Sequence, residues 1–210
     1  MKLNTYFRST AAYRVRIALE LKSVQHDLIP VNLLKGEQKS AKFLTKNPEG
    51  LIPVLDTGKH QLTQSMAILE YLEETYPEPA LLPSNLEQRA LVRSLAYIIS
   101  SDIHPLNNLR VLTFLRNEMA VSEDQKLAWY HHWVKAGFTS LEARLSESAG
   151  AFCVGDSLSF ADVCLIPQVY NAKRFDCPMH DYPTINRLNR DCMSLDAFSK
   201  TAPNLQPDAV

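Results

Sequence analysis

Strand and helix signals alternate over the first 80 residues, and this alternation constrains the fold more than any other feature of the sequence. Short apolar runs bounded by turn residues predict four strands, at 3–7, 27–32, 51–56 and 61–62. Apolar residues at helical spacing predict helices at 11–22 and from 64 onward, with a short helical piece at 39–44. The resulting order of elements predicts a small α/β layer.

Prolines break this pattern after residue 76 and predict a linker over 77–86. Beyond the linker, apolar residues recur almost entirely at helical spacing. We therefore expect an α/β domain over 1–80 and an all-helical domain over 87–210. The segment from Ala202 holds two prolines, and we expect it to be a loosely ordered tail.

Two hydroxyl residues, Ser9 and Thr10, stand where the first strand passes into the first helix. Both are good helix N-cap types, and a helix start gathers unpaired N–H groups and partial positive charge. This stretch could hold a thiolate or carboxylate, or it could simply cap the helix. Pro53 is unusual within a strand-like run, because it cannot donate to a ladder. It indicates an edge position, a bulge or a cis peptide bond after Ile52.

The composition excludes several classes of function. A net charge of −1 gives no electrostatic case for binding nucleic acid or an anionic membrane surface. No apolar run approaches the ~20 residues of a membrane span, and the first residues lack the apolar core of a signal peptide. The four cysteines show neither Cys-x-x-Cys nor zinc-ligand spacing. They predict reduced thiols in a cytoplasmic protein without a metal site, a structural disulfide being the alternative.

An ordered set of short motifs makes the sequence resemble the glutathione transferase family, and within it the zeta class of maleyl-acid isomerases. The motifs are Tyr6-Phe7-Arg8-Ser9, Arg14 to Leu19, Asn47-Pro48 with Ile52-Pro53, Gln64 to Glu74, Asp102 to Asn108, and Phe160-Ala161-Asp162. They span residues 3 to about 200. The resemblance implies an α/β thioredoxin-like N-terminal domain, an all-α C-terminal domain and a homodimer.

The resemblance also implies which residues form the site. Ser9 and Thr10 would lie near the sulfur of glutathione. Ile52, before a cis Pro53, would pair through its backbone with the cysteinyl unit. Further residues would hold the two ends of glutathione or line the other side of the site: Gln64 and Ser65 at the γ-glutamyl end, Gln38 at the glycyl end, and His104, Asn108 and Arg110 from the helical domain.

Two positions depart from the zeta pattern, which usually reads Ser-Ser-Cys-x-Trp. Here the third and fifth positions are Ala11 and Tyr13, so the protein cysteine near the substrate is absent. Bacterial maleylpyruvate isomerases resemble this chain in lacking the cysteine and in carrying an arginine at the place of Arg110. The resemblance thus favours a maleylpyruvate-like substrate without excluding maleylacetoacetate.

The activity implied is a glutathione-dependent cis–trans isomerisation of a maleyl β-keto acid by reversible thiolate addition. Because the substrate carries two carboxylates, cations should bind it, and we expect Arg8, Arg110 and Arg174 to do so. Arg14 and Arg16 could instead make salt bridges at a domain interface. The alternatives are a transferase or dehalogenase that conjugates glutathione to electrophiles, and a non-catalytic scaffold of the same fold.

Overall fold

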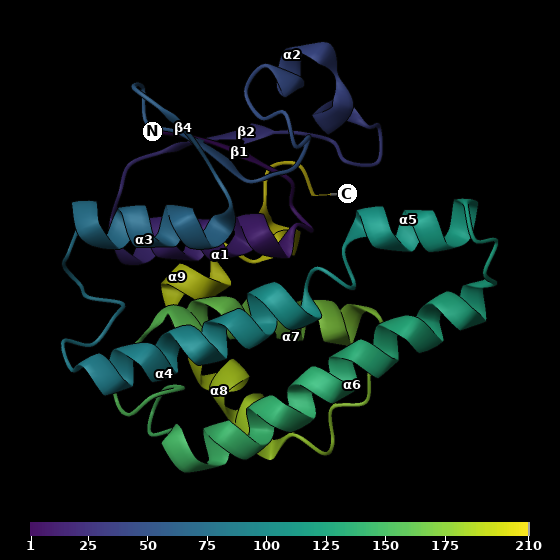
Figure 1. Cartoon of the computed structure of the whole chain (residues 1–210). Helices are drawn as coiled ribbons and strands as arrows, with labels where there is room; N and C mark the ends of the chain where they lie inside the picture. The colour runs from purple at the N-terminus through teal and green to yellow at the C-terminus, as the bar shows by residue number, and fades with distance from the viewer. Residues whose placement is uncertain (210) are drawn as a thin grey trace. The chain divides into compact units, whose positions relative to one another are not determined.

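The computed structural model describes residues 1–209, which form two compact units (Figure 1). The α/β unit comprises residues 1–80 and the described residues from 194 onward. The helical unit is Leu81–Met193. Each unit is described by itself.

A four-stranded mixed sheet forms one layer of the α/β unit. Its strands are β1 (Lys2–Thr5), β2 (Asp27–Pro30), β3 (Val54–Asp56) and β4 (Gln61–Thr63), in the spatial order β2-β1-β3-β4. The pair β1/β2 is parallel, and the pairs β1/β3 and β3/β4 are antiparallel. In this register Leu3 lies opposite both Leu28 and Leu55. The predicted α/β layer is thereby confirmed, with the first three strands shorter than expected.

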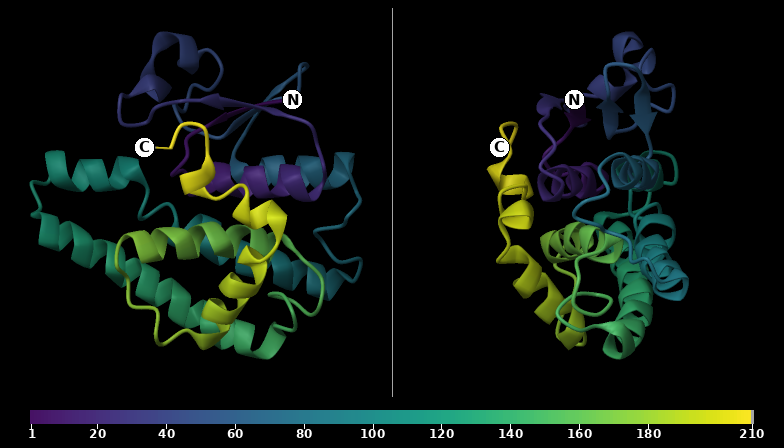
Figure 2. Two further views of the ribbon diagram at one scale, coloured as in Figure 1. Left: turned by 180° about the vertical axis from the view of Figure 1, so that it is seen from behind. Right: turned by 90° about the vertical axis from the view of Figure 1, so that its left-hand side faces the viewer.

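Two helices, α1 (Thr10–Leu21) and α3 (Ser65–Thr75), lie side by side on one face of this sheet (Figures 1 and 2). Their apolar faces and the central strands are buried, with Leu3, Ile17, Leu55 and Ile68 each 0% exposed. Burial of one such side chain contributes ~1.5–3 kcal/mol. The connection from β2 to β3 holds a 3₁₀ turn (Glu37–Lys39) and α2 (Ala41–Leu44).

The C-terminal tail is well packed, so the prediction of loose order after Ala202 is wrong. It forms α9 (Asp196–Ser199) and a 3₁₀ turn (Pro203–Leu205) that one of the two prolines begins. Gln206 is buried, and its amide donates to the Ala202 carbonyl at 3.0 Å. These residues, assigned from the sequence to the helical domain of 87–210, pack with the α/β unit instead, and α9 contacts α1.

Helices alone make up the helical unit, as predicted. They are α4 (Leu86–Tyr97), a π-helix (Ile98–Ile103), α5 (Leu109–Asn117), α6 (Glu123–Ser148), α7 (Phe160–Arg174) and α8 (Pro183–Met193). The central helix, α7, is buried along most of its length and packs against α4, α8 and the π-helix. Within residues 1–209 no helix is both long and apolar enough to cross a membrane.

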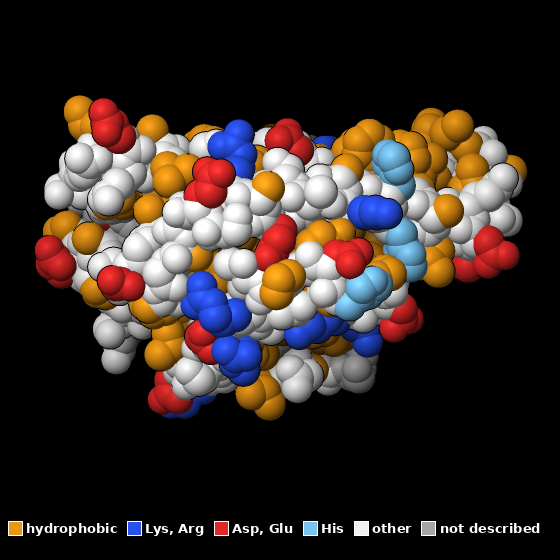
Figure 3. All heavy atoms as spheres, turned by 90° about the horizontal axis from the view of Figure 1, so that it is seen from below, with side chains coloured by type: hydrophobic (Ala, Val, Ile, Leu, Met, Phe, Trp, Pro, Cys, Tyr) orange, Lys and Arg blue, Asp and Glu red, His pale blue; other side chains and the backbone are white. Residues whose placement is uncertain are grey.

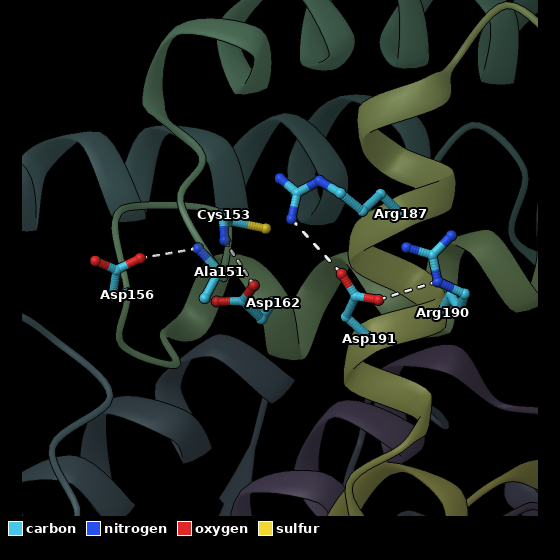
Figure 4. Close-up of polar contacts among 7 residues, drawn as sticks. All are labelled: Ala151, Cys153, Asp156, Asp162, Arg187, Arg190 and Asp191. Atoms are coloured by element: carbon cyan, nitrogen blue, oxygen red, sulfur yellow. Dashed lines mark hydrogen bonds and ion pairs between the residues drawn. The ribbon is translucent and has the colours of Figure 1, made fainter.

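A capping box before α7 is built around Asp162, whose contact with Cys153 is drawn in Figure 4. Its carboxylate accepts the N–H groups of Cys153 at 2.8 Å and Ser159 at 2.9 Å, as well as the Ser159 hydroxyl at 2.9 Å. Burial raises the pKa of Asp162, and these hydrogen bonds oppose that shift.

On the face shown in Figure 3, Lys and Arg side chains are interspersed with Asp and Glu.

Candidate functional site

Ser9, one of the two residues that the sequence offers as an N-cap, is the N-cap of α1. Its backbone is extended, and its hydroxyl oxygen accepts the N–H of Ala12 at 3.2 Å. A serine hydroxyl can accept and donate at once, so the cap leaves its proton to donate to another acceptor. Thr10 follows as the first residue of α1 and is 2% exposed. The half-buried Ser9 hydroxyl, at a positive helix end, is therefore suited to an anionic sulfur.

Ser65 begins α3 and is contacted by a buried arginine of α1. The Arg14 guanidinium, 1% exposed, donates from Nη1 to Ser65 Oγ at 3.2 Å. Guanidinium groups only donate, so Ser65 must accept here, and its own proton is left for an acceptor such as a carboxylate. The helices α1 and α3 pack together, and this contact joins α1 to the first residue of α3.

Gln64 occupies the N-cap position of α3 without capping it. Its φ is 64°, a left-handed conformation that is uncommon for a residue other than glycine, and its side chain makes no cap hydrogen bond. Instead its amide donates to the Glu49 carboxylate at 2.8 Å. Since no side chain caps α3 in this way, its N-terminus keeps the anion-binding character of a helix start.

Two further predicted positions lie in the connections before and after α2. The Ile52–Pro53 peptide bond is cis, one of the three alternatives drawn from the sequence. β3 begins only at Val54, so both residues lie outside the strand ladder. Gln38 lies in the 3₁₀ turn before α2, and its Oε1 is buried with no hydrogen-bond partner among residues 1–209. That oxygen could accept an N–H of a bound peptide.

In the helical unit, the predicted residues lie where the π-helix passes into α5. The N–H of His104 donates to the Ile99 carbonyl at 2.9 Å, closing the π turn. Asn108 caps α5 by accepting the N–H of Arg110 at 3.1 Å, and its amide donates to His104 Nε2 at 3.4 Å. Arg110 is exposed in the first turn of α5.

One turn of α6 holds both segments of the helical unit that carry predicted residues. Trp129 Nε1 donates to the Leu106 carbonyl at 2.9 Å, beside His104 and Asn108. His131 bonds the Phe175 carbonyl through Nε2 at 2.7 Å. Arg174, exposed at the end of α7, lies over the Phe175 ring at 4.8 Å from its centroid. The loop before α5 and the end of α7 are thus fixed to the same part of α6.

The arginines of the α/β unit divide into two kinds. Arg8 is half-buried, with its guanidinium 4.7 Å from the centroid of the Phe7 ring. Arg14 and Arg16, considered from the sequence as interface salt-bridge residues, are each 1% exposed and hydrogen-bonded inside the α/β unit. Sequence reasoning missed the contact between Arg14 and Ser65, because nothing local to either residue indicates it.

The cysteines lie in the interior of the protein. All four cysteines are buried free thiols. Burial raises the pKa of Cys153, and it raises the pKa of Cys177 to about 11. Over residues 1–209, no group of three or more His, Cys, Asp or Glu side chains is arranged to hold a metal ion.

The sequence and the fold both match known proteins. Residues 1–74 match the model of the glutathione S-transferase N-terminal domain. A protein of Vibrio cholerae named "Probable maleylacetoacetate isomerase" is 50% identical over 206 residues, covering 97% of this chain and 96% of its own.

Two solved structures have nearly the same fold. A holo structure of a maleylpyruvate isomerase, described as a bacterial zeta-class glutathione S-transferase, has a TM-score of 0.98 at 44% identity and covers both chains fully. A maleylacetoacetate isomerase of Methylobacterium extorquens AM1 with bound malonate and glutathione has a TM-score of 0.97 at 40% identity, again over both full chains. Full-length identity at this level, with the same fold, shows that the chain belongs to the zeta class of the glutathione transferase family.

Proposed function

We propose that this protein is a glutathione-dependent cis–trans isomerase of a maleyl β-keto acid, either maleylacetoacetate or maleylpyruvate. The observation that carries the proposal is the pair of hydroxyls, Ser9 and Ser65, at the starts of α1 and α3. Each oxygen accepts a hydrogen bond from the protein and so has its own proton left for an anion. The full-length similarity to enzymes named for this reaction supports it.

The α/β unit fits the three parts of glutathione. Ser65, with the Arg14 guanidinium behind it, and Gln64 would bind the carboxylate at the γ-glutamyl end. Ile52, before the cis Pro53, would pair with the cysteinyl backbone. Gln38 Oε1, buried without a partner among the described residues, would accept the N–H at the glycyl end. A glutathione-bound relative of the same fold supports this assignment.

Bound glutathione supplies the thiolate, whose addition to the substrate's double bond leaves a single bond that can rotate before the thiolate departs. The protein has to keep the sulfur anionic, and we assign this to the Ser9 hydroxyl, the start of α1 and Thr10. A free thiol has a pKa near 8.5, and a charge-assisted hydrogen bond of ~1.5–3 kcal/mol would lower it by roughly one to two units. That brings the thiol into a useful range near pH 7.

Cationic side chains and hydrogen-bond donors would bind the two carboxylates and the keto group of the substrate. We assign substrate binding to Arg8, Arg110 and Arg174, because the guanidinium fork binds a carboxylate through two parallel hydrogen bonds. His104 and Asn108, bonded to each other beside α5, would line the same site. The malonate in the related structure is a dicarboxylate and supports this anion-binding role.

No cysteine of this chain is needed for the reaction. Ala11 replaces the usual one, and the four that remain are buried. The reactive sulfur would therefore be that of glutathione alone. We further propose that the protein acts as a homodimer in the cytoplasm, as the family resemblance implies.

The test offers both maleyl acids to the enzyme, with and without glutathione, and follows the loss of their ultraviolet absorbance. We expect isomerisation only with glutathione, which remains unconsumed. Stoichiometric consumption of glutathione would instead identify a conjugating transferase. Failure to bind glutathione, together with unchanged behaviour of Ser9→Ala, would identify a scaffold.

A further inference from the structure

The peptide units just before Ser9 are held by side chains on both sides. The N–H of Phe7 donates to Asp208 Oδ2 at 3.0 Å, although 201 residues separate them in the chain. The carbonyl of Phe7 accepts from Arg16 Nη2 at 3.2 Å. Ser9 is tied to the same segment, because its N–H donates to the Tyr6 carbonyl at 2.9 Å.

The C-terminal tail brings Asp208 to this segment through contacts within the α/β unit. Tyr13 Oη donates to the Phe198 carbonyl at 2.8 Å, and Arg16 Nε donates to the Thr201 carbonyl at 3.2 Å. At its end, Ala209 packs against the buried cluster of Tyr6, Phe7, Val31, Phe43, Ile52 and Val54. The tail therefore runs from α1 to the segment that carries Ser9.

Arg16 connects the two sides of this arrangement. Its buried guanidinium donates to Thr5 Oγ1 at 3.0 Å and to the Phe7 carbonyl, while Nε bonds the tail. The other oxygen of Asp208, Oδ1, is buried and has no hydrogen-bond partner within residues 1–209. Asp208 is thus not neutralised by a bidentate ion pair, and its hydrogen bond to a backbone N–H is the contact that accounts for its position.

We propose that Asp208 is a positioning residue for the Ser9 hydroxyl, acting through the Phe7 peptide. The inference rests on the proposed function, in which Ser9 donates to the sulfur of glutathione. Because a hydrogen bond weakens steeply with distance and angle, a small movement of residues 6–9 would weaken that donation. The tail then fixes the site from a distance, without touching glutathione itself.

The experiment compares Asp208→Ala with Asp208→Asn and measures the pH midpoint at which bound glutathione ionises, from the ultraviolet absorbance of the thiolate. Asp208→Ala removes the acceptor and should raise the midpoint by about one unit, which is a tenfold loss of thiolate below the midpoint. Asn keeps an acceptor oxygen and should restore the midpoint. Asp196→Ala, in the same tail, removes an exposed carboxylate paired only with Lys200 among the described residues, and should leave the midpoint unchanged.

A direct electrostatic role predicts the opposite direction. Removing a negative charge near the thiolate would stabilise it, so both Asp208 variants would lower the midpoint and overturn the proposal. A midpoint unchanged in Asp208→Ala would also overturn it. Ser9→Ala is measured in parallel: if that variant ionises glutathione normally, the assigned role of Ser9 fails, whereas a shift in Ser9→Ala without one in Asp208→Ala refutes the tail's role alone.

Discussion

Replacing Ser9 by alanine removes two interactions whose sizes can be compared. The Ser9 oxygen caps α1 by accepting the Ala12 N–H at 3.2 Å, and loss of such a cap costs ~1 kcal/mol of stability. A typical unfolding free energy is ~5–15 kcal/mol, so the variant remains folded. The same change removes the donor that we assign to the sulfur of glutathione, a hydrogen bond worth ~1.5–3 kcal/mol, or about one to two pKa units.

The sign of the pH effect follows from the ionised state. A hydrogen bond to the thiolate lowers the pKa of bound glutathione, so activity rises with pH through that lowered value. Ser9→Ala should move the rising limb of the kcat profile upward by about one to two units, with a smaller change in the affinity for glutathione. Stopped-flow or steady-state rates across pH measure this directly.

Two further variants separate the hydroxyl from the cap. Glycine is a tolerable N-cap, so Ser9→Gly restores most of the stability without supplying a donor. If the hydroxyl matters, Ser9→Gly and Ser9→Ala show the same upward shift. If fraying of α1 causes the defect, Ser9→Gly recovers activity and the reasoning is refuted. Ser122→Ala, which loses the N-cap of α6, is the control for an unrelated cap.

Three further substitutions and one chemical modification test individual contacts of the structure. Arg14→Gln should weaken glutathione binding about tenfold in calorimetric titration, and should add little to the loss in Ser65→Ala, because the two side chains act as one unit. Arg110→Ala should raise KM for the maleyl acid more than for glutathione; equal effects would contradict substrate binding. Asp162→Ala, which leaves two backbone N–H groups without their acceptor, should lower the unfolding free energy by ~3 kcal/mol in chemical denaturation. Alkylation at pH 8 should spare the native cysteines and the activity, because Cys177 with a pKa of about 11 is only ~0.1% thiolate there, whereas the denatured chain should react at all four.

Local pattern predicted most elements of this fold, and it failed where hydrogen bonding or packing decides a boundary. The third strand begins at Val54 instead of residue 51, and Pro53 just before it has no N–H to donate. Within the predicted all-helical domain, α4 changes to a π-helix at Ile98. Close packing accompanies that turn: a Cβ on Gly137 would lie 2.2 Å from Ile103 Cδ1.

The candidate site was predicted from the sequence because its residues lie in short motifs, whereas the contacts that support them join residues far apart in the chain. Asp208 and Phe7 are separated by 201 residues, and Arg16 and Thr201 by 185. No local periodicity reports such a contact, and two prolines in the tail favoured disorder. The same reasoning considered Arg14 and Arg16 for salt bridges at a domain interface, whereas both are buried and hydrogen-bonded within the α/β unit.

The two buried arginines, Arg14 and Arg16, hydrogen-bond to different segments on two sides of α1. Successive helical residues are about 100° apart, so Arg14 and Arg16 point to nearly opposite sides of α1 and cannot serve the same contact. Arg14 donates to Ser65 at the start of α3, and Arg16 donates to the segment before Ser9 and to the tail. A lysine at position 16 would present one ammonium where Nε, Nη1 and Nη2 of Arg16 each donate a hydrogen bond. The helix that Ser9 caps therefore also fixes both groups of residues, on its two sides, that we assign to binding glutathione.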